Sequence, residues 1–341
     1  MAANLTLANK NPFSTFDFLG YFIPGAFAIG IAYLLSDGLS FHEEIPQSID
    51  NLKKMMNNHE GYVIFMLILS SYVLGHLISY LSSVTVEIFY IWCNGYPTDY
   101  LLLDGLEKEC ILFSKKGGAG NIWHVIVCGI IFPLFVCHFL VEKLLVVGPF
   151  LSKRINDDMR ELLIKRINKL LNKMGYGKTI SKEDKSTLDV HRAVMHYVYE
   201  NCQQHIVKYD NYVAIYGFLR SITLIFNMAF MYVVFRFFSQ YGAYVNCWSI
   251  IIAVMLSSII FVYANSKLKE SSFNSVLCAV SGVFVIFFTC SIFSSESKAG
   301  EIFQMLVLFL LTYLSYLGYT KFYRRFTLEN LMSLLVCKEL D

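Results

Sequence analysis

The chain contains a series of apolar runs, each about as long as a membrane is thick. A bilayer hydrocarbon core of about 30 Å is crossed by roughly 20 mostly apolar residues in a helix. Seven runs come close to this length or exceed it: Phe16–Leu35, Tyr62–Cys93, Trp123–Val147, Tyr212–Phe238, Cys247–Ala264, Phe273–Phe293 and Ile302–Tyr319. The sequence therefore predicts an all-α integral membrane protein with about seven transmembrane helices.

The composition supports the same class. Hydrophobic residues make up 56% of the 341 residues and charged residues 16%, and the mean hydropathy is +0.51. A soluble domain carries about 25% charged residues, so this chain has too few to cover a surface that faces water. The net charge of +2 offers no basic surface on the scale of a nucleic-acid-binding protein, and no direct nucleic-acid contact is expected.

The nine cysteines are scattered, mostly inside apolar runs, without paired C-x-x-C spacing. This pattern is typical of small buried hydrophobic residues and not of a disulfide framework or a zinc ribbon. The N-terminus lacks a basic region and a small-residue cleavage site, so no removable signal peptide is expected.

Residues 150–209 form the one long polar block, and they divide the chain. Amphipathic spacing from Leu151 to Met174, followed by a second helical pattern from Val190 to Ile206, predicts a helical insertion. The expected regions are an N-terminal membrane region (1–149), the insertion (150–209), a C-terminal four-helix membrane region (210–320) and a short amphipathic tail helix (321–341).

Basic residues in the connections predict the orientation. The 150–209 block holds twelve Lys and Arg residues, which places it in the cytoplasm together with the C-terminal tail. Seven crossings would leave the N-terminus outside. If the run that contains Pro133 is re-entrant, the N-terminus is inside, and the sequence leaves both topologies open. The run Tyr62–Cys93 is too long for one straight crossing.

A polar stripe within the second run is the first candidate functional feature. Its members are spaced by three or four residues and share one helical face: Tyr72, His76, Tyr80, Ser83 and Glu87. Polar groups are costly in hydrocarbon, so this seam is expected to face protein, water or an oligomer axis. Two interpretations stay open, a pore lining or proton-titrating pair and a set of hydrogen bonds that join neighbouring helices.

The third run carries a similar face with His124, His138 and Glu142. His138 and Glu142 are one turn apart and could pair. If the two seams face each other, these residues would meet His76 and Glu87. The alternative is that Glu142 lies at the membrane surface. Arg220 and Arg236, near the two ends of the fourth run, are expected to extend to opposite membrane interfaces.

The insertion contains one cluster of polar side chains that could bind a metal. His196 and Glu200 lie one turn apart, which suits two ligands, but no third ligand has the right spacing. We therefore expect surface or packing residues here and no metal. Motifs for nucleotide binding, serine hydrolysis or zinc proteolysis are absent from the sequence, so neither an enzyme nor a cofactor is expected.

Two motifs carry a resemblance. The opening Phe16-Asp17-Phe18-Leu19-Gly20-Tyr21-Phe22-Ile23-Pro24-Gly25 and the run Gly75-His76-x-x-Ser79-x-x-Ser82-Ser83 resemble a loose class of prokaryotic multi-pass proteins, some of which sit among antiphage defence genes. The resemblance implies a bacterial inner-membrane location and an effector or sensor role, and it carries no catalytic residues.

The expected function is that of an inner-membrane effector or sensor in antiphage defence. Such a protein perturbs the membrane when it is triggered. Its expected partners are the lipid bilayer, further copies of the chain in a homo-oligomer, and a cytoplasmic protein that contacts residues 150–209. The alternative is an ion or small-solute transporter or channel that uses the His, Ser and Glu seam.

Overall fold

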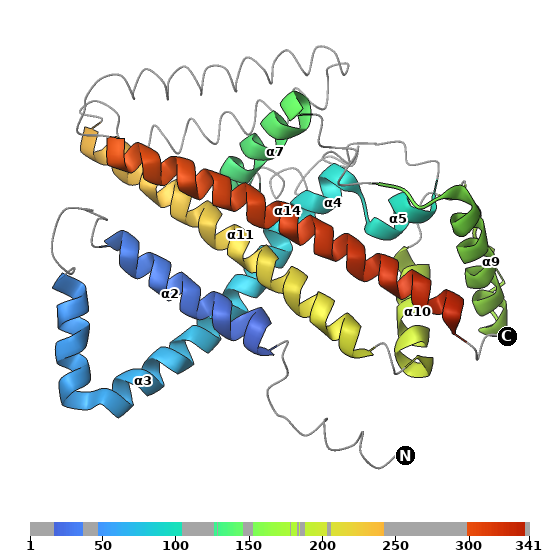
Figure 1. The fold of residues 1–341 in the computed structure, drawn as a ribbon, viewed down its shortest axis with the longest axis horizontal. Coiled ribbons are helices and arrows are strands. Elements are labelled where there is room, and N and C mark those ends of the chain that lie inside the picture. The colour runs from blue at the N-terminus through green and yellow to red at the C-terminus, as the bar shows by residue number, and fades with distance from the viewer. Residues whose placement is uncertain are drawn as a thin grey trace.

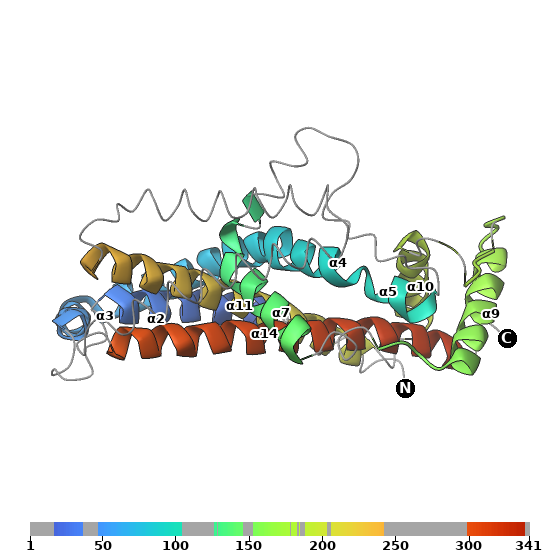
Figure 2. The same cartoon turned by 90° about the horizontal axis from the view of Figure 1, so that it is seen from above.

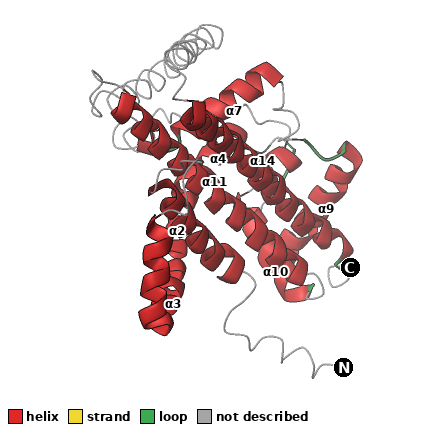
Figure 3. Ribbon diagram, turned by 60° about the vertical axis from the view of Figure 1, so that its left-hand side comes forward, coloured by secondary structure: helices red, strands yellow, loops and turns green. Residues whose placement is uncertain are grey.

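The computed structural model describes ten stretches of the chain, and every regular element in them is helical (Figure 3). These stretches are 17–36, 47–103, 126–127, 129–145, 153–177, 179–182, 184, 188–202, 206–241 and 299–337. The predicted spans at 247–264 and 273–293 lie outside them. The all-α prediction is confirmed for the described residues.

The first apolar run folds as a π-helical turn, η2 (Phe18–Phe22), that continues into α2 (Ile23–Ser36). It packs on α3 (Gln47–Ser82). The two helices touch through glycines, because a Cβ placed on Gly25 would overlap the carbonyl of Ser71 and one on Gly75 the carbonyl of Tyr21. Small residues permit this approach of two backbones. The two motifs of the resemblance are therefore one packing contact.

The second apolar run bends, which its length alone did not predict. Helix α3 passes into the π-helical turn η3 (Ser83–Glu87) and then α4 (Ile88–Asn94). Gly95 follows with a φ of 75°, a conformation that favours glycine. This turn starts α5 (Pro97–Leu102), whose residues are all buried.

Two long helices run side by side through the molecule (Figure 1). They are α11 (Ile206–Tyr241) and α14 (Ala299–Val336), with 36 and 38 residues. Helix α7 (Phe132–Leu145) packs across them. The amphipathic helices α9 (Asp157–Lys173) and α10 (Leu188–Asn201) lie at one end of the pair (Figure 2).

The buried residues form two cores. The bundle core joins α2, α3, α4, α7, α11 and α14, and includes Phe89, Leu134, Phe230 and Tyr316. The head core joins α5, α9 and α10 to the start of α11 and the end of α14. We call this second unit the head.

Four described segments are long and apolar enough to cross a membrane: Phe18–Leu35, Gly61–Leu102, Ile206–Phe237 and Gly300–Val336. They match the first, second, fourth and seventh predicted runs. The count of seven is not reached within the described residues. Helix α7, with 14 residues, spans only about 21 Å.

Two predicted boundaries differ from the structure. Residues 321–336 do not form a separate tail helix, because α14 continues through them without a break. Helix α5 packs in the head core, although the sequence grouped it with the N-terminal membrane region. The position of α5 depends on contacts between distant segments, which local periodicity does not reveal.

Candidate functional site

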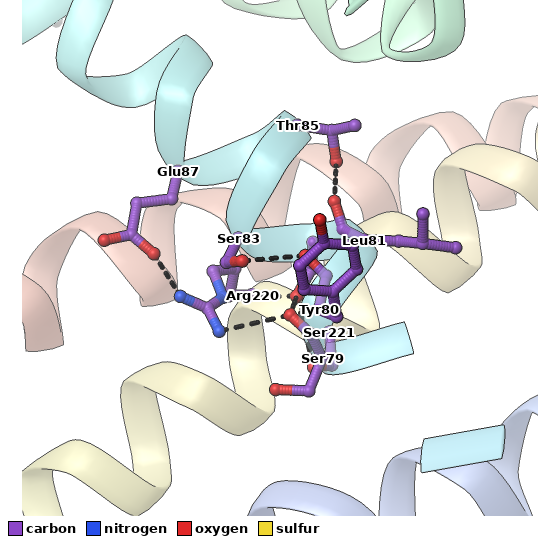
Figure 4. A network of polar contacts seen from close by, with 9 residues as sticks. Ser79, Tyr80, Leu81, Ser83, Thr85, Glu87, Arg220 and Ser221 are labelled. Atoms are coloured by element: carbon purple, nitrogen blue, oxygen red, sulfur yellow. Dashed lines mark hydrogen bonds and ion pairs between the residues drawn. The ribbon is translucent and has the colours of Figure 1, made fainter. Parts of the chain in front are cut away.

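The most developed polar site joins α11 to the π-helical turn η3 (Figure 4). Arg220 of α11 forms an ion pair with Glu87 through Nη1. Its Nε donates to the hydroxyl of Ser82 at 3.1 Å and its Nη2 to the carbonyl of Ser79 at 3.3 Å. We call Arg220, Glu87, Ser82 and Ser79 the junction.

The local sequence explains why the helix deforms here. Ser82, Ser83 and Thr85 each donate to a carbonyl in the preceding turn, at 2.9, 2.7 and 2.7 Å. Hydroxyls that bond the helix backbone compete with its regular ladder and bend it, and π-helical turns often mark functional sites. The guanidinium then adds a donor to the carbonyl of Ser79.

Tyrosine rings surround the junction on its inner side. Tyr216 of α11 packs against Tyr323 of α14 at 5.2 Å between ring centroids, and Tyr319 against Tyr323 at 5.7 Å. Glu87 is close enough to act electrostatically on all three phenols. The side chain of Glu87 remains 25% exposed and that of Arg220 12%, so the pair is only partly enclosed.

A second ion pair lies at the other end of α11. Arg236 contacts Glu301 of α14 at 3.4 Å and donates to the carbonyl of Leu35 at 3.2 Å. Sixteen residues separate Arg220 from Arg236, which corresponds to about 24 Å along the helix. Both arginines are mostly buried and bind groups of neighbouring helices, contacts that the sequence did not predict.

Between the two ion pairs, Asn227 forms hydrogen bonds with backbone groups where a neighbouring helix is interrupted. Its Oδ1 accepts from the backbone N–H of Leu134 at 3.2 Å, and its Nδ2 donates to the carbonyl of Ile130 at 2.7 Å. Pro133 lacks an N–H and disturbs the backbone here. The amide of Asn227, which is completely buried, satisfies the groups that the break leaves.

The structure divides the predicted seam on α3. Glu87 and, beside it, Ser83 lie at the junction, whereas His76 and Tyr80 are exposed on the outside of α3. The imidazole of His76 stacks on Tyr21 at 3.9 Å and meets Tyr72 edge-on at 4.6 Å. Its contacts therefore belong to the surface between η2 and α3.

One member of the second predicted seam, His138, packs among aromatic rings. It is buried between Phe89 of α4 and Tyr316 of α14, each at 5.6 Å between ring centroids. The side chain of Glu142 lies outside the described part of α7.

The head contains a partly buried histidine but no assembled metal site among the described residues. His196 and Glu200 are both exposed on α10. Burial, and then the charge of Arg192, lower the pKa of His191 to about 4. Its Nε2 is enclosed without a hydrogen bond, so the neutral imidazole is the favoured form.

Two of these relationships were missed from the sequence. Arg220 and Glu87 are 133 residues apart, and Asn227 is 97 residues from Ile130. A usable signal was the presence of opposite charges in two separate apolar runs, since buried charges are usually paired. Nothing in the sequence around Asn227 points to α7.

Comparison of the chain with protein-family models, with curated proteins and with solved structures gives no match. The geometry of the junction and of the head therefore carries the functional conclusion.

Proposed function

We propose that the protein is a multi-pass effector or sensor of the bacterial inner membrane, in which the cytoplasmic head controls the packing of the membrane helices. The observation that carries this proposal is the continuity of α11 and α14. Each helix contributes to both the bundle core and the head core, so a displacement of the head displaces both helices in the bundle.

The junction is the point where such a displacement would reach the other helices. Tyr216 packs against both cores, and Arg220 follows it one turn later on α11. Movement of α11 along its axis would strain the bonds that Arg220 makes with Glu87 and with the carbonyl of Ser79. A π-helical turn has a weakened ladder, so η3 is the place where the bent helix would yield.

The spacing of the charged residues on α11 fits a location of this helix in the membrane. The segment of α11 between Arg220 and Arg236 carries no charge, and its length of about 24 Å falls within a hydrocarbon core of about 30 Å. The head then projects on the cytoplasmic side, as its basic residues indicate. The resemblance of the two packed motifs supports infection by phage as the trigger.

Self-association is part of the proposal. The broad exposed surface of α3 includes one set of residues spaced by four and three positions, the spacing of a helix-pairing stripe: Tyr62, Met66, Leu69, Val73, His76 and Tyr80. An imidazole is costly in lipid, and a second copy of α3 would cover it. His76→Leu should lower the yield of cross-linked dimer without reducing membrane insertion, because leucine inserts favourably. Leu77→Ala changes a neighbouring uncharged residue outside this set and should give the wild-type yield.

The effector proposal is tested by recording membrane potential and protein level together in triggered cells. The wild type should depolarise the membrane, and Glu87→Gln should weaken this effect. Glu87→Gln also leaves Arg220 partly buried without its carboxylate, which is destabilising. The double variant Glu87→Gln/Arg220→Gln removes both charges and separates the two causes.

If the carboxylate is needed for activity, the double variant is abundant but does not depolarise. If the pair is only structural, the double variant restores both abundance and depolarisation. An unchanged potential in triggered wild-type cells, at normal protein abundance, would exclude the effector role.

A transporter or channel is the second candidate, and the irregular backbone at the start of α7 supports it. Irregular backbone within a membrane is tolerated where protein or water covers it, and interrupted helices often form solute sites. Asn227 lies about midway between Arg220 and Arg236, which sets the break at mid-depth. Solute-dependent currents in reconstituted vesicles, reduced in Asn227→Leu by more than the loss of folded protein accounts for, would favour this function.

A further inference from the structure

Two segments far apart in the sequence bring basic residues together where the bundle meets the head. Arg324 of α14 donates to the backbone carbonyl of Lys153 from Nε at 3.2 Å and from Nη2 at 2.6 Å. Lys153 and Arg154, just before α9, are both exposed. These bonds fix the start of the head against α14.

Helix α14 adds more cations beside this contact. Lys321 and Arg325 are one turn apart and exposed, and Arg324 lies between them and is partly exposed. Residues spaced by three and four share a helical side, and the bonds from Arg324 to the carbonyl of Lys153 bring this side next to the segment of Lys153 and Arg154. We call the five residues the basic collar.

Two neighbouring acidic groups pair with basic residues outside the collar. Glu329, one turn beyond Arg325, pairs with Lys208 at 2.6 Å. Asp157, at the start of α9, pairs with Arg160. The five basic residues of the collar outnumber these acids and Asp158, also in the first turn of α9, although the whole chain is nearly neutral.

Aromatic residues mark the depth of the collar in the membrane. Tyr212, Tyr216, Phe322 and Tyr323 pack on one another between the two cores. Such rings gather at the level of lipid headgroups. The α14 segment from Ile302 to Thr320 is free of charged residues, and Lys321 is the first cation after it.

We propose that the basic collar binds the headgroups of anionic phospholipids in the cytoplasmic leaflet and so holds the head against the membrane. Lys and Arg near a membrane surface attract acidic lipids, and guanidinium groups fit phosphate with paired donors. This inference requires that α11 and α14 cross a bilayer, and it does not depend on an effector role.

The test is a titration of the full-length protein in detergent micelles with fluorescently labelled phosphatidylglycerol, followed by anisotropy and compared with labelled phosphatidylcholine. The wild type should bind the anionic lipid more tightly. Each cation near the surface contributes about fivefold, so Lys321→Gln/Arg325→Gln should weaken binding by about 25-fold. The control Lys165→Gln/Lys169→Gln removes the same charge from exposed positions on α9 and should bind like the wild type.

Equal binding of the two lipids by the wild type would overturn the proposal, as would equal losses in both double variants. Full displacement of the labelled lipid by inorganic phosphate would indicate a site for free anions and also contradict it. Melting temperatures identify a misfolded variant; in that case the exposed Lys321→Gln alone, with an expected loss of about fivefold, takes its place.

Discussion

Gly75→Ala should strongly weaken the packing of α2 on α3. A Cβ on Gly75 would lie well under 3.0 Å from the backbone carbonyl of Tyr21, and backbone cannot move aside as a flexible side chain can. Overpacking costs about 1–3 kcal/mol, and a rigid obstacle places this site at the upper end. The helices must separate, which also weakens the stack of Tyr21 on His76, worth about 0.5–1.5 kcal/mol.

The expected loss is about 3 kcal/mol, or about a hundredfold in the folding equilibrium. It can be measured by unfolding the purified protein with a denaturing detergent in mixed micelles. Gly30→Ala is the matched control on α2, because no atom lies within 4 Å of its added Cβ, and alanine favours a helix over glycine. If Gly75→Ala unfolds like Gly30→Ala, the backbone contact is refuted.

Three further predictions concern other parts of the chain. The free energy of unfolding should fall as the pH drops from 6.5 towards 4, because His191 is protonated first in the unfolded chain and only near a pKa of about 4 in the folded chain. A His191→Phe variant that keeps the full pH dependence would contradict this. Asn227→Leu should destabilise the protein by about 2–4 kcal/mol, because the buried N–H of Leu134 and a second backbone group lose their partner; thermal unfolding that matches the wild type would show that these bonds contribute little. A cysteine at Lys165 should resist an impermeant thiol reagent in intact cells without native reactive cysteines, whereas one at Ser239, at the other end of α11, should react; the reverse pattern would invert the topology.

The sequence predicted well where the signal was local. Runs of apolar residues identified the four segments that are long and apolar enough to cross a membrane. The amphipathic spacing of α9 also held, since Leu163, Ile167 and Leu170 are buried on one side. Each of these features depends on residues within a few turns of one another.

Only one side of the candidate site could be predicted from the sequence, because its parts come from distant helices. The spacing of Glu87 and Ser83 marked one side of the junction, but the partner, Arg220, was interpreted by itself as a residue near the membrane surface. A helical face also covers a wide angle, so His76 and Glu87 could appear on the same stripe. The π-helical turn between them rotates Glu87 towards α11.

The coupling of the head to the bundle is tested most directly at Arg166. This residue on α9 donates to the carbonyl of Cys337 at 2.7 Å, beyond the end of α14. Arg166→Gln should reduce depolarisation in triggered cells at normal protein abundance, whereas Lys165→Gln, an adjacent exposed change of equal charge, should respond like the wild type. Wild-type depolarisation by Arg166→Gln would contradict control of the membrane helices by the head through this contact.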